Sequence, residues 1–298
     1  MSQSANLTRV RPPDFDVIAP RAPAANVGTR RIVLRTAGQR QGPITRLVSP
    51  SGVGDLIKPF VFLDHAEVPF TGRKLFGIHP HSGIATLTTV LQGALTYEDT
   101  TGKSGQVLQG GLEWMKAGNG VWHDGGPLRG DPLRVFQLWV ALPAAEENAP
   151  PESQYIAADA VEEDGPVRVI LGRHGRASSR ISGAPESINY LLVHLKDGEL
   201  WRYVPPPGHN VGWLAVDKGR LHVPEVIGSA ELAVFEESED AIEVRSEGDT
   251  SFVIGSAVKH PHPLVLGYYS VHTSEEALAQ GEAGISRIGQ RLRAEGRL

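Results

Sequence analysis

Residues 77–124 have the sequence GIHPHSGIATLTTVLQGALTYEDTTGKSGQVLQGGLEWMKAGNGVWHD, in which short apolar or alternating runs are separated by glycine-rich breaks. Comparable runs occur on both sides of this stretch, at 32–37, 60–64 and 133–142. Gly, Pro, Asp and Asn interrupt the runs at intervals of about ten residues. This spacing predicts an all-β sandwich or barrel.

A second set of strand-like runs follows between residues 167 and 258, after an acidic, proline-rich segment at 143–165. Such a segment is typical of a linker or a long crossover. We therefore predict an extended N-terminal arm over 1–28, an N-terminal domain over 29–145, a linker over 146–165 and a C-terminal domain over 166–298.

Only the tail of the chain has a helical pattern. Ser274 precedes Glu275 and Glu276, as an N-cap residue followed by early acidic residues should. We expect Gly281 to end this helix and residues 285–296 to form one or two further amphipathic turns.

The composition of the chain excludes several classes of site. The 298 residues include 34 Gly and 22 Pro but no Cys. The absence of Cys excludes a disulfide scaffold, a thiolate zinc site, an iron–sulfur cluster and a cysteine nucleophile. There is also no phosphate-binding loop, no nucleophile elbow and no dinucleotide fingerprint in the sequence.

The distribution of charge and apolar residues bears on partners and location. No run approaches 18 apolar residues and the N-terminus lacks a signal-peptide pattern, so we expect a cytoplasmic protein without a membrane span.

The net charge is −5, but residues 1–46 carry eight Arg against two Asp. This basic arm could contact an acidic protein surface, whereas the absence of interleaved aromatic residues argues against nucleic acid. The oligomeric state stays open.

Three of the eleven histidines have a spacing that suits a metal ion. His79 and His81 are two residues apart, so on a strand both side chains point to one face, about 6.6 Å apart along the axis. His123 follows a glycine turn, and two predicted hairpin steps can bring it opposite this pair. From the residues alone, a metal site and a set of core or solvated histidines both remain open.

The same stretch resembles the pirin family of bicupins, in its HPH segment and in WMKAGNGVWH over 114–123. The segments at 58–67 and 262–281 are also similar to that family, and the resemblance spans about residues 30–285. It implies two tandem cupin domains, which are jelly-roll-like β-barrels, with a short C-terminal helix. It also implies one metal ion on His79, His81 and His123 of the N-terminal domain, with Fe(II) first and Ni, Cu or Zn as alternatives.

The sequence departs from the pirin pattern at two acidic positions. Gly125 stands where the family has a glutamate that completes the metal site, and Ala85 replaces a second glutamate. The candidates for a fourth ligand or a supporting residue are Asp124, His65 and Glu98.

The loss of an anionic ligand lowers the expected metal affinity, so a weak or empty site is an alternative. The second His-Pro-His, His260 to His262, has no third ligand at a comparable spacing, and we expect it to lie in a loop.

The resemblance implies two kinds of function. One is a quercetinase-like dioxygenase acting on a small aromatic or flavonol-like molecule, for which no catalytic residue can be assigned from the sequence. The other is a non-enzymatic regulatory or redox-sensing protein that binds a partner.

Overall fold

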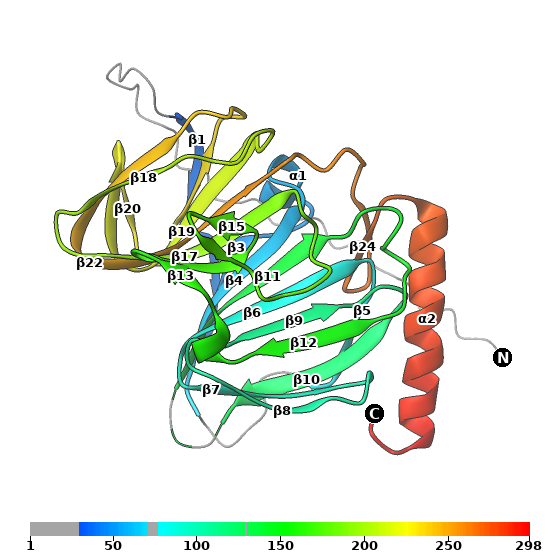
Figure 1. The fold of residues 1–298 in the computed structure, drawn as a ribbon. Helices are drawn as coiled ribbons and strands as arrows, with labels where there is room; N and C mark the ends of the chain where they lie inside the picture. Colours follow the sequence, from blue (N-terminus) through cyan, green and yellow to red (C-terminus); the bar gives the residue numbers. More distant parts are fainter. Residues whose placement is uncertain (1–29, 71–76, 129, 131) are drawn as a thin grey trace.

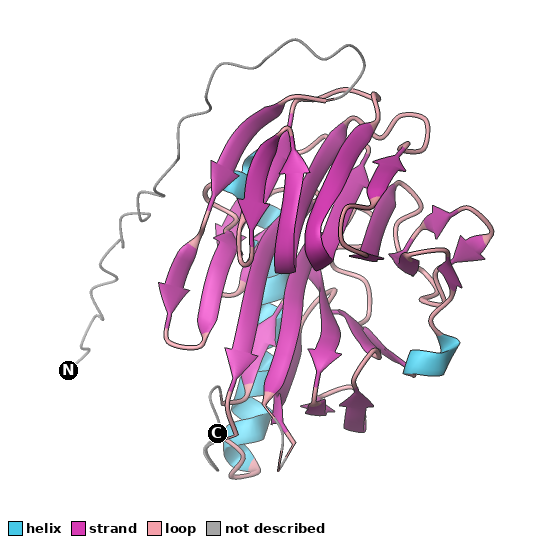
Figure 2. Cartoon of the chain, turned by 90° about the vertical axis from the view of Figure 1, so that its left-hand side faces the viewer, coloured by secondary structure: helices cyan, strands magenta, loops and turns pink. Residues whose placement is uncertain are grey.

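The computed structural model describes residues 30–70, 77–128, 130 and 132–298, so the predicted arm over 1–28 lies outside the described residues. Strands dominate this part of the chain (Figure 2). The N-terminal half forms two antiparallel sheets. The first sheet contains, in spatial order, β12 (Glu152–Ile156), β9 (Leu112–Lys116), β6 (Ile84–Gln92), β11 (Leu133–Ala141), β4 (Phe60–Val68), β3 (Ile44–Val48) and β2 (Gln39–Gln41). The second contains β5 (His79–His81), β10 (Val121–Pro127), β7 (Ala94–Asp99) and β8 (Ser104–Leu108).

The C-terminal half is built on one nine-stranded sheet. Its strands are β1 (Ile32–Thr36), β21 (Leu232–Phe235), β19 (Val211–Val223), β22 (Ile242–Ala257), β17 (Ile188–Leu195), β14 (Val167–Leu171) and β13 (Glu163–Asp164), with β18 (Leu200–Tyr203) paired to β22 and β20 (Glu225–Gly228) paired to β19. Two small hairpins are β15 (Arg173–His174) with β16 (Ala177–Ser178), and β23 (Val265–Gly267) with β24 (Ser270–His272). The helices are α1 (Val53–Leu56), the 3-10 turn η1 (Ala158–Ala160) and α2 (Glu275–Ala294). This architecture confirms the predicted all-β class with a C-terminal helix.

The two halves exchange elements. β1 pairs with β21 of the C-terminal sheet, although it begins the chain segment that we assigned to the N-terminal domain. In the other direction, α2 contacts β10 and runs beside the N-terminal sheets (Figure 1). The boundaries 29–145 and 166–298 therefore stay a prediction about folding units, and the structure describes two halves joined by exchanged elements.

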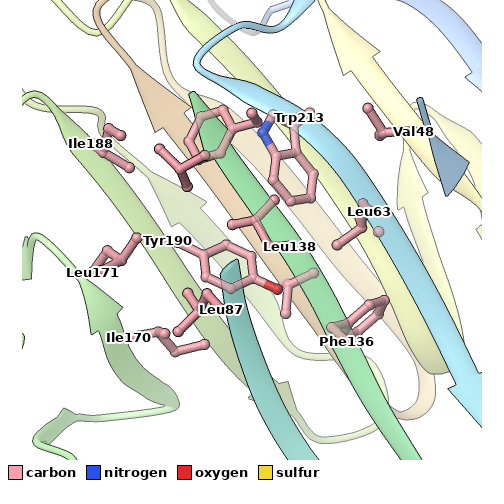
Figure 3. Packing of buried hydrophobic residues seen from close by; sticks show 14 of the residues in the cluster. Val48, Leu63, Leu87, Phe136, Leu138, Ile170, Leu171, Ile188, Tyr190 and Trp213 are labelled. Atoms are coloured by element: carbon pink, nitrogen blue, oxygen red, sulfur yellow. The ribbon is translucent and has the colours of Figure 1, made fainter. Parts of the chain in front are cut away.

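One apolar core joins the two sheet assemblies. Phe136 and Leu138 of β11 belong to one buried cluster with Tyr190 of β17 and Trp213 of β19 (Figure 3). The ring of Trp213 lies 5.2 Å from that of Phe60 on β4, in an edge-to-face contact. A second core is enclosed within the C-terminal half, where β22 pairs with β18 near its start and with β17 near its end.

The C-terminal helix differs from the expectation at one point. Ser274 caps it as predicted, because its Oγ accepts a hydrogen bond from the backbone N–H of Ala277 at 3.1 Å. However, α2 continues through Gly281 to Ala294 instead of ending there. A Cβ at Gly281 would lie 2.5 Å from Nε2 of His272 and from Oγ of Ser82. Glycine is thus present because the helix packs closely on its neighbours, and not because the helix ends.

Within the described ranges, no helix is long and apolar enough to cross a membrane. The expected cytoplasmic location stays a prediction.

Candidate metal centre

Two neighbouring strands bring the three predicted histidines together. β5 carries His79 and His81 on one face, because alternate residues of a strand point to the same side. β10 runs antiparallel to β5 and places His123 directly opposite His79. β5 is an edge strand, where Pro80 can be accommodated although it has no N–H to donate.

The imidazole nitrogens of the three residues converge. Nε2 of His123 lies 3.0 Å from Nε2 of His79 and 3.2 Å from Nε2 of His81. Nitrogens bound to one ion at about 2.1 Å and at right angles would be about 3.0 Å apart. Among the residues that the structure describes, this is the one group of three or more His, Cys, Asp or Glu with ligand atoms close enough to hold a metal, all within 4.8 Å.

The hydrogen bonds of the Nδ1 atoms determine which nitrogen of each ring turns a lone pair toward the other histidines. Nδ1 of His79 donates to the carbonyl oxygen of Gly77 at 2.9 Å, and Nδ1 of His81 donates to that of Tyr269 at 3.1 Å. A neutral imidazole that donates through Nδ1 has an unprotonated Nε2. Two Nε2 lone pairs therefore point at the same small space, an arrangement that a cation stabilises. Metal-bound histidines in proteins commonly have such outer partners.

Burial keeps two of these rings neutral. It lowers the pKa of His79 to about 4, with the nearby His123 adding to the effect. Burial also moves the pKa of His81 well below its ordinary value, helped by His123 and His79. Because metal ions bind the neutral imidazole, these rings need not lose a proton at pH 7 before they bind an ion. The donor set, three imidazoles in a buried site, fits Fe, Ni, Cu or Zn.

These lowered pKa values predict how the stability of the metal-free protein depends on pH. Between about pH 4 and 6.5 the unfolded chain binds more protons than the folded chain, so the free energy of unfolding should rise with pH in this window. Each histidine contributes at most about 1.4 kcal/mol per pH unit. Urea unfolding of chelator-treated protein from pH 4.5 to 7.5 measures the slope, and His79→Gln should make it shallower. An equal slope in both proteins would contradict the assignment.

A segment from the far end of the chain forms one wall of the site. Tyr269 lies between β23 and β24 in a left-handed conformation, with φ of +54°, which is uncommon for a residue other than glycine. Its ring centroid is 5.6 Å from that of His79 and 5.8 Å from that of His81. Trp139 of β11 packs edge-on against His81 at 4.9 Å. Tyr269 is 42% exposed, so this residue borders both the histidine group and the solvent.

Buried polar contacts hold this segment in place. Ser82, which follows β5, bonds Oγ of Ser270 and Nε2 of His272, each at 2.9 Å. Glu147 accepts hydrogen bonds from the backbone N–H and the hydroxyl of Thr273, both at 2.7 Å. The wall is thus anchored to the same strand end that carries His81.

The three other candidates from the sequence lie outside the histidine group of the described chain. Nε2 of His65 contacts Asp217 at 3.0 Å, so His65 links the two halves. Glu98 pairs with Arg297 and is about half exposed. Asp124 is buried next to His123, and its charge acts to raise the pKa of His79.

The two departures from the pirin pattern lie in tightly packed places. Gly125 pairs with Tyr97 across β10 and β7, and a Cβ there would lie 2.8 Å from the carbonyl oxygen of Thr96. Ala85 is fully buried on β6. A glutamate at 125 therefore requires the backbone of β7 to shift in this chain.

Two residues near the site were missed by the sequence reasoning. Tyr269 falls in the tail segment of the resemblance, where nothing local indicates contact with residues 188 positions away. Glu113 stands in a strand among apolar residues, yet it is only 4% exposed and its Oε1 lies 3.9 Å from Nδ1 of His123. The available signal for Glu113 was a charged residue between the apolar residues Leu112 and Trp114.

Comparisons with known proteins find related sequences and chains with the same fold. A protein-family model described as Pirin matches residues 43–140. A Pseudomonas aeruginosa relative named "Putative quercetin 2,3-dioxygenase" is 30% identical over 252 residues, which cover 78% of this chain and 87% of the relative.

Two solved structures share the fold. The quercetin 2,3-dioxygenase from Acinetobacter baumannii has a TM-score of 0.77 at 24% identity and covers 87% of this chain and 97% of its own. A bacterial pirin from Escherichia coli in complex with nickel(II) has a TM-score of 0.59 at 19% identity and covers 74% and 95% of the two chains.

Proposed function

Because this chain belongs to the pirin family, we propose that it is a metal-dependent dioxygenase acting on a flavonol-like molecule. The observation that carries the proposal is the convergence of three Nε2 atoms at one point inside the N-terminal sheets. Three protein ligands leave coordination positions open, as catalytic metal sites require. The relative from Pseudomonas aeruginosa supports the reaction class through its name.

His79, His81 and His123 would hold one divalent transition ion. Fe(II) is our first candidate because the pirin resemblance implies iron, and Ni(II) is second because the Escherichia coli pirin binds it. When bound, the ion supplies Lewis-acid polarisation of a substrate oxygen. The carbonyl groups of Gly77 and Tyr269 keep two of the rings oriented toward the ion.

The aromatic wall would orient the substrate. Tyr269 and Trp139 border the histidines, and flat aromatic rings stack favourably on such side chains. A flavonol-like ring system placed against Tyr269 would direct its oxygen atoms toward the ion while excluding water from one side.

Tyr269→Ala tests this wall. We expect KM for quercetin to rise about 2- to 13-fold, since one aromatic contact contributes about 0.5–1.5 kcal/mol. Tyr269→Phe keeps the ring and should leave KM within twofold of the wild type. Because the carbonyl that bonds His81 belongs to the backbone, metal content should be unchanged in both variants. An equal KM in all three proteins would show that the ring does not contact the substrate.

The function itself is tested with untagged protein purified without chelator. Metal content is measured first, and consumption of quercetin and of dioxygen is then followed after loading with Fe(II) or Ni(II). Metal-dependent consumption of quercetin and of dioxygen, which a chelator abolishes, supports the dioxygenase. Stoichiometric metal without turnover of quercetin or related flavonols would reject it.

The absence of a carboxylate at Gly125 favours a second candidate, a regulatory or redox-sensing protein that binds a partner. In that case the protein holds little or no metal, or holds it without turnover. The turnover assay therefore separates the two functions.

A further inference from the structure

Glu113 is a buried carboxylate that faces the histidine group from the opposite sheet. It lies on β9, and adjacent residues of a strand point to opposite faces. Trp114 packs in the core shared with the C-terminal half, which leaves Glu113 on the inner face, toward β10 and His123. Its negative charge acts on His79, Tyr97 and Tyr155.

One oxygen of this carboxylate is held in place and the other faces His123. The hydroxyl of Thr88 on β6, directly opposite Glu113 in the sheet, donates to Oε2 at 2.7 Å. Oε1 lies 3.9 Å from Nδ1 of His123, about 1 Å beyond a charge-assisted hydrogen bond. A small side-chain rotation would close this gap.

The charge of Glu113 lacks a basic partner in the described chain. No Lys or Arg side chain of the described residues forms an ion pair with it, and His123 is the one His, Lys or Arg of those residues whose side-chain nitrogen lies within 4 Å of its carboxylate. A buried carboxylate is costly unless an opposite charge balances it. A divalent ion on the far side of the His123 ring would supply that balance.

Nδ1 of His79 and Nδ1 of His81 each donate to a backbone carbonyl oxygen, whereas in the described chain Nδ1 of His123 faces the carboxylate of Glu113. We propose that Glu113 is a positioning residue that accepts a hydrogen bond from Nδ1 of His123 and so directs Nε2 of His123 toward the ion. This inference rests on the proposed metal site. The negative charge that the site lacks at Gly125 is thereby supplied from β9, through His123 and not by direct ligation.

The test measures Zn(II) affinity by chelator competition in wild type and Glu113→Gln. The amide has nearly the same shape but no charge, and loss of such an outer partner typically weakens metal affinity about 10- to 100-fold. The Nδ1–H resonance of His123 in the ¹⁵N-labelled, zinc-loaded protein should move upfield in the variant. Glu113→Asp should recover part of the affinity. Affinity within twofold of the wild type and an unchanged resonance would overturn the proposal.

Two further variants keep the result interpretable. Asp217→Asn removes another buried carboxylate that contacts a histidine, His65, away from the triad, and should leave zinc affinity unchanged. If Glu113→Gln does not fold, Thr88→Val frees Oε2 and should weaken zinc binding about threefold; unchanged affinity would overturn the proposal. Because zinc is redox-inert and no turnover is measured, failure of the dioxygenase proposal leaves this result intact. A wild-type protein that binds no zinc would overturn both.

Discussion

His123→Ala is expected to lower the affinity for a divalent transition ion by more than about 100-fold, so that the purified protein contains almost no metal. His123 is the central member of the group, with its Nε2 within 3.2 Å of both other Nε2 atoms. Even the loss of a residue that only supports a ligand costs about 10- to 100-fold, and removal of a ligand should cost more. Elemental analysis and chelator competition measure the effect.

The control for this experiment is His222→Ala. His222 is a half-exposed histidine paired with Glu247 in the C-terminal half. Its replacement shows whether surface histidines contribute to the measured metal content. Its metal content should equal that of the wild type. Equal metal content in His123→Ala and wild type would show that the triad does not bind the ion, and both the dioxygenase and the Glu113 proposals would then fail.

Trp213→Ala is expected to lower the free energy of unfolding by about 3–5 kcal/mol, the usual cost of removing a large aromatic residue from a core. Trp213 is fully buried, and its ring contacts Phe60 of the N-terminal half and Tyr190 of the C-terminal half. Because this core joins both sheet assemblies, both halves should lose stability together. Urea unfolding followed by far-UV circular dichroism measures the change.

Leu200→Ala provides the comparison, because Leu200 is 72% exposed and its truncation should change stability by less than about 0.5 kcal/mol. Two separate unfolding transitions in Trp213→Ala, with one at the wild-type midpoint, would contradict the idea of a shared core. In that case the two predicted domains would be independent folding units.

Much of the candidate site could be predicted because it depends on local geometry. Two histidines separated by one residue share a face of any strand, and the glycine turn before His123 made a return to that strand plausible. The fourth position could not be assigned in the same way. Asp124 is adjacent to His123 in the sequence, His65 matches a family position and Glu98 lies on a predicted hairpin. The structure pairs His65 with Asp217 and Glu98 with Arg297.

The sequence by itself determined the all-β class, the pairing of His79 with His81 and the cap at Ser274, since each depends on neighbours within a few residues. Only the tertiary structure decided that α2 passes through Gly281 and that Tyr269 and Glu113 border the histidines. Contacts between residues far apart depend on how complete sheets pack. Strand periodicity shows which face a side chain occupies, but not which strand of the opposite sheet it meets.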